Sequence, residues 1–307
     1  MPRLSRNLTL LGKLSLGVGT VLRKLAIAAA AIAAAYACPA AAGPSGKGVQ
    51  LAWFQKDNIF RSGLRGTHTL ALTFDDGPNF NTPSVLDALK QYNIKATFFI
   101  VGVMAHAYPA VLARVAAEGH LLGNHSATHP LLGGHYDDDP QALINQIRIV
   151  HDDIAPLSPA GTIFYFRAPY GAWRTAHAAI LNADPVLKNY VGPIYWDEGG
   201  SIEIRGGYIM SAADWDCWHR GWDAEKCAKG YLREIRRDNG GVVLMHCIHT
   251  HSGDLVRAVL PILVAEGYNF VRLDQIPEYK QYETPQPAAP VVALAKADYP
   301  VNAAAGR

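Results

Sequence analysis

Two adjacent carboxylates, Asp75 and Asp76, follow an apolar run ending in Phe74 and precede a Gly-Pro turn. Neighbouring acids repel each other unless positive charge lies beside them. An Asp-Gly pair is often only a turn. However, both acids would be needed if one held a metal ion and the other acted as a base. The pair therefore predicts metal-assisted base chemistry, with a structural turn as the alternative.

Two histidines, His125 and His129, follow another apolar run and are four residues apart. This spacing can direct both imidazoles at one point, as metal ligands require. On spacing alone, the pair could equally belong to a polar surface loop. Together with Asp76 they form a His, His and carboxylate set that leaves positions open for water and substrate. We expect Zn²⁺, although cobalt, nickel or iron could substitute.

An arginine and a third histidine follow two further apolar runs. Arg167 opens the segment Arg-Ala-Pro-Tyr-Gly, where it would hold Asp75 ionised while the Tyr170 N–H faces an oxyanion. His246 closes the segment Leu-Met-His, where its imidazole could protonate a leaving amine. The alternatives are an ordinary ion pair and a buried structural histidine.

The apolar runs that carry these residues alternate with stretches of helical spacing. We expect strands at 69–74, 96–101, 120–123, 163–166, 191–196, 241–245 and 269–273, and helices at 83–92, 109–118, 140–154, 175–181, 224–237 and 255–266. Strands buried on both faces and linked by helices form a parallel sheet, and seven of them suit a closed barrel. We predict an α/β fold, a single (β/α) barrel-like domain over residues 69–275, with seven or eight parallel strands. Chemistry in such barrels collects at the carboxyl ends of the strands.

Composition and charge exclude several classes of protein. Of 307 residues 50% are apolar and 18% charged, which excludes a disordered chain. Five of the 28 Lys and Arg residues lie in 1–42, where there is no acid, so the remainder holds 23 basic and 26 acidic residues. A net charge of −3 gives no support to nucleic-acid binding by the folded part.

The N-terminal segment 1–42 has the order of a secretory signal: a basic stretch, then the apolar run 25–37, then small residues. We expect export, with cleavage after Ala42, and a secreted or periplasmic location. The alternative is a weak membrane anchor, which would give membrane contact only if the segment is retained. Residues 43–68 are expected to be a connector, and 280–307 a flexible tail.

Cysteine usage agrees with export. If Cys38 is removed with the leader, three cysteines remain and one must stay unpaired. Cys217 and Cys227 are close in sequence among polar residues and are the favoured disulfide, whereas Cys247 ends an apolar run and is expected to be a buried thiol.

The four motifs, in this order, resemble the polysaccharide deacetylase family, also called the NodB homology domain or carbohydrate esterase family 4. The signatures Thr-Phe-Asp-Asp-Gly, His-Ser/Thr-x-x-His, Arg-x-Pro-x-Gly and Leu-x-His are complete within about residues 69–275. The resemblance implies a distorted barrel and a divalent metal. It also implies these roles: Asp75 general base; Asp76, His125 and His129 metal ligands; Arg167 orienting the base; Tyr170 contributing its N–H; His246 general acid; and Leu244 lining the acetyl pocket.

A further family motif is an Asp-Trp pair whose Asp orients the catalytic histidine and whose Trp walls the pocket. Asp214-Trp215 fits this motif best, although Asp197 follows Trp196 directly at a strand end. Asp214 is favoured because only it precedes a tryptophan and because a desolvated imidazolium needs a carboxylate partner.

Other polar and aromatic residues carry weaker signals. Five of the six tryptophans fall between 173 and 222, where they could stack on sugar rings or pack an irregular loop. A second metal site at His249 and His251 is the less favoured interpretation. The acidic run 137–139 before Pro140 is expected to complement a helix dipole.

The resemblance implies an exported, metal-dependent N-deacetylase that converts acetamido groups of N-acetylglucosamine-type glycans to amine and acetate. Peptidoglycan, chitin oligomers and an exopolysaccharide are all candidate substrates. The alternatives are an O-acetyl esterase acting on acetylxylan and a non-catalytic carbohydrate-binding barrel.

Overall fold

The computed structural model describes Phe54 and residues 62–280. The expected signal or anchor segment 1–42, Cys38 and nearly all of the expected tail therefore lie outside the described residues. None of the helices in this described part has the length and apolarity that crossing a bilayer requires.

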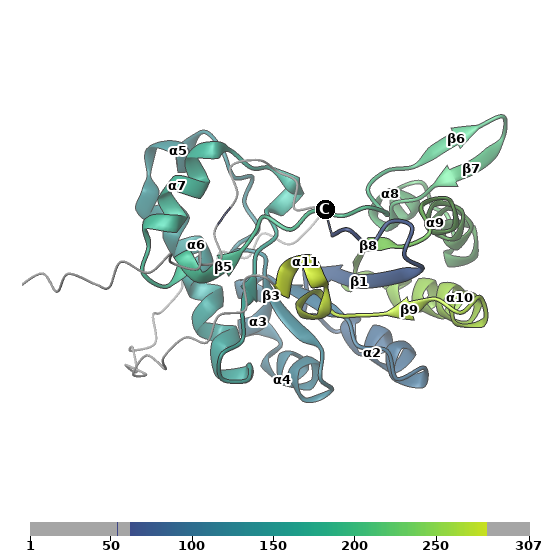
Figure 1. Cartoon of the computed structure of the whole chain (residues 1–307), viewed down its shortest axis with the longest axis horizontal. Helices are drawn as coiled ribbons and strands as arrows, with labels where there is room; N and C mark the ends of the chain where they lie inside the picture. The colour runs from purple at the N-terminus through teal and green to yellow at the C-terminus, as the bar shows by residue number, and fades with distance from the viewer. Residues whose placement is uncertain (1–53, 55–61, 281–307) are drawn as a thin grey trace, which may run out of the picture. The chain divides into compact units, whose positions relative to one another are not determined.

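The core of the fold is a parallel barrel with interrupted strands (Figure 1). One sheet has the order β3 (Leu121–Asn124), β2 (Thr97–Ile100), β1 (Thr69–Asp75) and β8 (Gly241–His246), and β9 (Asn269–Phe270) pairs with the start of β1. A second parallel sheet pairs β4 (Phe164–Tyr165) with β5 (Tyr190–Val191). Single parallel bridges continue the barrel: Asn124 to Phe166 joins β3 to the residue after β4, and Glu198 to Val243 joins the segment after β5 to β8. The predicted α/β barrel is confirmed, and its distortion lies where β4 and β5 shrink to two residues each.

The six predicted helices are all present, with ends shifted by three residues at most. They are α2 (Thr82–Gln91), α4 (Pro109–Ala117), α6 (Pro140–Ile154), α7 (Thr175–Ala183), α9 (Ala224–Asp238) and α10 (Ser252–Ala265). Four short helices were not predicted: α3 (Gly102–Ala107), α5 (His135–Asp138), α8 (Asp214–His219) and α11 (Pro277–Lys280). With four to six residues each, they are too short to show helical periodicity in the sequence.

Helix α6 shows how local sequence specifies an element that packs on the barrel. Pro140 occupies the first turn, and the Asp139 carboxylate accepts a hydrogen bond from the Ala142 N–H at 3.0 Å. The buried residues Leu143, Ile147, Val150 and Ile154 then recur every three or four positions along one face. This apolar face covers β3 and the start of the chain segment that carries the two predicted metal-binding histidines.

An antiparallel hairpin of β6 (Glu203–Arg205) and β7 (Tyr208–Ser211) follows the barrel segment at Glu198 and projects from the domain in Figure 1. It falls in a stretch where the sequence predicted no element. Its exposed side chains include Ile204 and Tyr208, so it lacks the buried face that gives a strand its apolar alternation.

The segment expected to be a connector contributes to the core. Phe54 is 2% exposed and stacks against Trp173 and Tyr190, and Leu64 is buried against the barrel. The predicted cysteine chemistry is confirmed: Cys217 and Cys227 form a disulfide with a Cα–Cα distance of 5.9 Å, and Cys247 is a buried free thiol.

Candidate active site

The parallel register of β1 and β8 places two of the predicted residues opposite each other. Asp75 pairs with His246 at the carboxyl ends of these strands. The next strands in the sheet, β2 and β3, end at Ile100 and Asn124, so His125 lies at the same edge. The predicted base, acid and first metal-binding histidine therefore lie at the carboxyl ends of strands of one sheet, at the mouth of the barrel.

Asp76, His125 and His129 form a group suited to a metal ion. Oδ1 of Asp76 lies 3.4 Å from Nε2 of His125 and 3.1 Å from Nε2 of His129. Nδ1 of His125 lies 2.8 Å from the Arg167 carbonyl oxygen, which requires the proton on Nδ1 and leaves the Nε2 lone pair facing Asp76. Oδ1 of Asp76 is buried without a regular hydrogen bond. A divalent cation between these three atoms would satisfy all of them, so the residues fit a zinc-type site.

The backbone at this group is held in an uncommon conformation. Asp76, Ser126 and His129 have φ values of 71°, 69° and 54°, in the left-handed region that non-glycine residues rarely adopt. Such conformations persist where the surrounding structure imposes them, and they cluster at functional sites. Burial alone would raise the pKa of Asp76, but the neighbouring imidazoles of His125 and His129 and the charge of His246 hold it well below its usual value.

Asp75 and Arg167 form a buried ion pair, with 2.8 Å between Oδ1 and Nη1. The guanidinium also donates to Thr73 Oγ1 at 2.7 Å and to the carbonyl oxygens of Ile194 and Tyr195. With its donors used, Arg167 fixes one oxygen of Asp75 while the other lies 3.5 Å from Nε2 of His125. A carboxylate oriented in this way beside a metal-ligand group is able to accept a proton from an attacking water.

His246 pairs with Asp214 and not with Asp197. Its Nδ1 lies 2.8 Å from Asp214 Oδ1, and its backbone N–H donates to Oδ2. Asp197 instead accepts from Ser62 Oγ and the Val242 N–H and pairs with Arg65. Burial alone would lower the pKa of His246, but the charge and hydrogen bond of Asp214, with the charges of Asp76 and Asp75, raise it to about 10. The ring is therefore a proton donor whose Nε2 lies 3.9 Å from Asp76.

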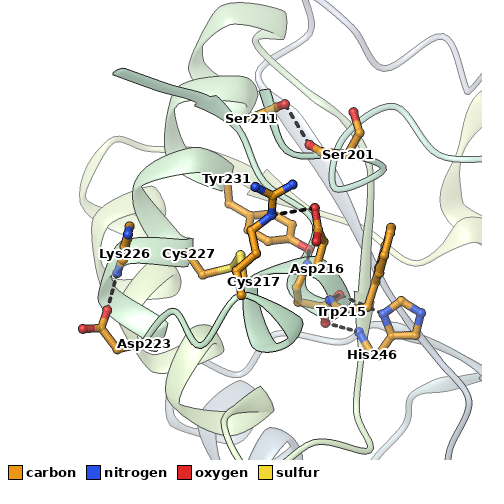
Figure 2. The surroundings of a disulfide bond; sticks show 12 residues. Ser201, Ser211, Trp215, Asp216, Cys217, Asp223, Lys226, Cys227, Tyr231 and His246 are labelled. Atoms are coloured by element: carbon orange, nitrogen blue, oxygen red, sulfur yellow. Dashed lines mark hydrogen bonds and ion pairs between the residues drawn. A yellow bond between two sulfur atoms is a disulfide. The ribbon is translucent and has the colours of Figure 1, made fainter. Parts of the chain in front are cut away.

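The three residues predicted to contact substrate lie close to the proposed acid and metal ligands in the sequence or in space. Tyr170 has a φ of 58°, is 68% exposed and sets its ring against His129 at 4.6 Å between centroids. Trp215 is 54% exposed and lies beside His246 in Figure 2. Leu244 is buried two residues before His246. The mouth therefore combines charged groups with exposed aromatic faces.

The residues with weaker sequence signals make structural contacts. His249 stacks on Trp218 at 5.2 Å and 10° between planes, and among the described residues only Asp76, His125 and His129 bring three metal-type ligands together. The acidic run does more than complement a dipole, because Asp137 pairs with Arg174 and His177 while Asp139 caps α6.

Sequence reasoning missed two hydroxyl groups behind the site. Thr73 accepts from Arg167 and donates to the Val243 carbonyl at 2.8 Å. The buried hydroxyl of Tyr231 contacts the backbone of both Asp214 and Leu244. Thr73 belongs to the first motif and could have been found there, whereas nothing in the local sequence of Tyr231 indicates its partners.

Comparison with known proteins agrees with this geometry. Residues 63–186 match the family profile described as polysaccharide deacetylase. The chain is 36% identical over 194 residues to a peptidoglycan-N-acetylglucosamine deacetylase of Bacillus cereus, covering 55% of this chain and 68% of that protein.

Two solved structures share the fold. A crystal structure of a peptidoglycan N-acetylglucosamine deacetylase superimposes with a TM-score of 0.53 at 28% identity and covers 68% of this chain and 87% of the other. A family 4 acetyl xylan esterase from Clostridium thermocellum gives a TM-score of 0.53 at 26% identity, covering 69% and 91%. The family profile, the relative and the shared barrel together show that the chain belongs to the polysaccharide deacetylase family.

Proposed function

We propose that this polysaccharide deacetylase is an exported, zinc-dependent N-deacetylase that acts on N-acetylglucosamine units, with peptidoglycan as the foremost substrate. The observation that carries the proposal is the convergence of an arginine-paired Asp75, a ligand group at Asp76 and an aspartate-paired His246 at one barrel mouth. The names of the B. cereus relative and of the solved deacetylase support the substrate class.

In this proposal each charged residue has one task. Asp75, oriented by Arg167, takes a proton from the attacking water. The Tyr170 N–H donates to the negatively charged oxygen that forms from the acetyl carbonyl when water attacks it. His246, held as a cation by Asp214, gives its proton to the departing nitrogen, which leaves as a free amine while acetate is released.

The metal is proposed to be Zn²⁺, held by Asp76, His125 and His129. When bound, it supplies Lewis-acid polarisation of the amide carbonyl and of the attacking water. Two imidazole nitrogens and one carboxylate oxygen are a donor set that zinc accepts with a position left open. The location is proposed to be extracytoplasmic because a peptidoglycan substrate lies there and because the Cys217–Cys227 disulfide needs an oxidising compartment.

The test is acetate release by the full chain on peptidoglycan, N-acetylglucosamine oligomers and acetylxylan, each with a chelator and with zinc restored. We expect release from an N-acetylated glycan that the chelator stops and zinc recovers. The variant His129→Ala should lose both zinc and activity, whereas His249→Ala, outside the ligand group, should keep zinc stoichiometry. No release from any of the three glycans with zinc bound would favour a carbohydrate-binding barrel without turnover.

An O-acetyl esterase is the second candidate, supported by the likeness to the Clostridium thermocellum acetyl xylan esterase. When an ester is hydrolysed the leaving group is an alkoxide, which needs a strong proton donor less than the departing nitrogen of an amide does. The Asp214–His246 pair therefore favours the amide. Acetylxylan turnover exceeding that of every N-acetylated glycan would reverse the assignment.

A further inference from the structure

Helix α8 begins with the carboxylate that holds His246, yet it has only six residues, Asp214–His219. A helix this short is not stable by itself and takes its position from tertiary contacts. Asp214 is fully buried, and its two oxygens receive the imidazole and the backbone N–H of His246. Any shift of α8 therefore changes the hydrogen bond that orients the proposed general acid.

Two contacts from helix α9 hold α8 in place. The Cys217–Cys227 disulfide joins the helices, and the loop between them folds back with the Trp222 N–H donating to the Cys217 carbonyl. Figure 2 shows the disulfide and Tyr231 on the same side of α9, as their spacing of four residues requires.

The hydroxyl of Tyr231 forms the second contact and connects both partners of the acid pair. It accepts from the Asp214 N–H at 3.1 Å and donates to the Leu244 carbonyl at 2.9 Å. Leu244 lies two residues before His246 on β8, so one buried hydroxyl bonds to the backbone on each side of the Asp214–His246 hydrogen bond. Tyr231 itself is fully buried and touches neither the metal ligands nor the base by any hydrogen bond found in the described residues.

The approach of α9 to this region is close. A Cβ at Gly230 would lie 2.5 Å from the Ala212 side chain and 2.9 Å from the Ala212 backbone nitrogen. The helix that carries Tyr231 thus lies directly against the segment that leads into α8, two residues before Asp214.

We propose that Tyr231 and the Cys217–Cys227 disulfide are positioning elements for proton delivery. They hold Asp214 at hydrogen-bonding distance from His246, and without them the leaving nitrogen is protonated slowly. This inference rests on the proposed function for its kinetic consequence. It predicts a defect limited to the step that needs the acid, with metal binding and substrate affinity kept.

The first test compares Tyr231→Phe with Tyr268→Phe. Both changes remove a buried tyrosine hydroxyl, but Tyr268 bonds only the Ile235 carbonyl of α9, at 3.5 Å. We expect Tyr231→Phe to lower kcat on N-acetylglucosamine oligomers about tenfold or more, with KM and bound zinc unchanged, since general acids contribute about 10²–10⁴-fold. Tyr268→Phe should stay within about twofold of the wild type on the same scale. An aryl acetate, whose phenolate leaves without a proton, should lose far less rate than the amide in Tyr231→Phe.

The second test removes the disulfide. The double variant Cys217→Ser, Cys227→Ser should show the same selective loss of kcat on amides. In the wild type, reduction of the disulfide by a trialkylphosphine should reproduce the loss of kcat. In that reaction the disulfide becomes two thiols and the phosphine becomes its oxide, with the oxygen coming from water. The phosphine should add nothing to the loss in the double variant, which retains Cys247.

A third readout does not depend on turnover. In protein labelled with ¹⁵N-histidine, the Nδ1 proton of His246 should exchange with solvent faster in Tyr231→Phe than in Tyr268→Phe. Wild-type kcat and unchanged exchange in Tyr231→Phe would overturn the inference. A wild type that releases no acetate would instead contradict the proposed function, and the exchange experiment would still decide the positioning role.

Discussion

Buried carboxyl groups at the two ends of strand β8 differ in whether a cationic side chain lies beside them. At the carboxyl end, Asp75 lies beside the Arg167 guanidinium and Asp214 holds the His246 imidazole. At the amino end, the side chain of Glu198 lies over Gly241 with both oxygens buried, and no described residue forms a hydrogen bond with them.

The difference depends on which carboxylates the nearby arginine side chains pair with. Arg65 pairs with Asp197 and Asp238 and leaves none of its close contacts for Glu198. Burial, followed by the charges of Asp197, Asp238 and Glu234, raises the pKa of Glu198 to about 10. The pKa of Glu234 is raised to about 7, mainly by burial. One end of β8 therefore pairs its buried carboxylates with Arg167 and His246, and the other end keeps Glu198 protonated.

The most direct test of this difference is to make the same carboxyl-to-amide substitution at both ends of β8. Asp75→Asn should lower kcat roughly 10³–10⁴-fold, because the amide cannot accept the water proton. Glu198→Gln should leave kcat within about twofold, because that residue is neutral at pH 7 and remote from the reacting atoms. Acetate release by both variants measures the effect.

Bound zinc is the control for this pair. Asp75 is not among the three ligands, so Asp75→Asn should retain zinc. Activity surviving in Asp75→Asn would remove Asp75 from the role of base, and a comparable loss in Glu198→Gln would show that the two ends are not distinct.

Two arginine variants compare how much an ion pair at each end of β8 contributes to the free energy of unfolding. Arg167→Met leaves the buried carboxylate of Asp75 without its cation and should lower the free energy of unfolding by about 3–5 kcal/mol. Arg65→Met removes two ion pairs from a side chain that is 54% exposed and should cost about 1 kcal/mol or less. Urea unfolding of both variants gives these values. Equal losses would mean that burial does not distinguish the two pairs.

The last prediction concerns the pH dependence of stability. Because the folded-state pKa of Glu198 lies above its unfolded value of about 4.5, the folded protein binds a proton that the unfolded chain releases. The free energy of unfolding should therefore fall as pH rises between these two values, by up to about 1.4 kcal/mol per pH unit from this group.

Urea unfolding of wild type and Glu198→Gln from pH 6 to 9 measures this contribution. The variant should lose less stability per pH unit because its amide does not titrate. Parallel slopes for the two proteins would show that Glu198 is not held neutral in the folded state.

Much of the fold and the site was predictable from the sequence because the signals are local. A strand that ends in Phe74-Asp75-Asp76, or a histidine pair four residues apart, carries its spacing within one element. The α6 boundaries followed in the same way from Asp139, Pro140 and a periodic apolar face. The short helix α8 and the β6–β7 hairpin carry no such periodicity, and both were missed.

The sequence by itself determined which side chains are available for chemistry and the order of strands and helices that carries them, and it favoured the Cys217–Cys227 disulfide without deciding it. Only the tertiary structure decided which of them meet. Asp214 and not Asp197 reaches His246 across 32 residues, Arg167 reaches Asp75 across 92, and Glu198 is buried without a cation. These outcomes depend on strand register and on how short elements pack, and a one-residue change in either moves a side chain to a different partner without altering any local pattern.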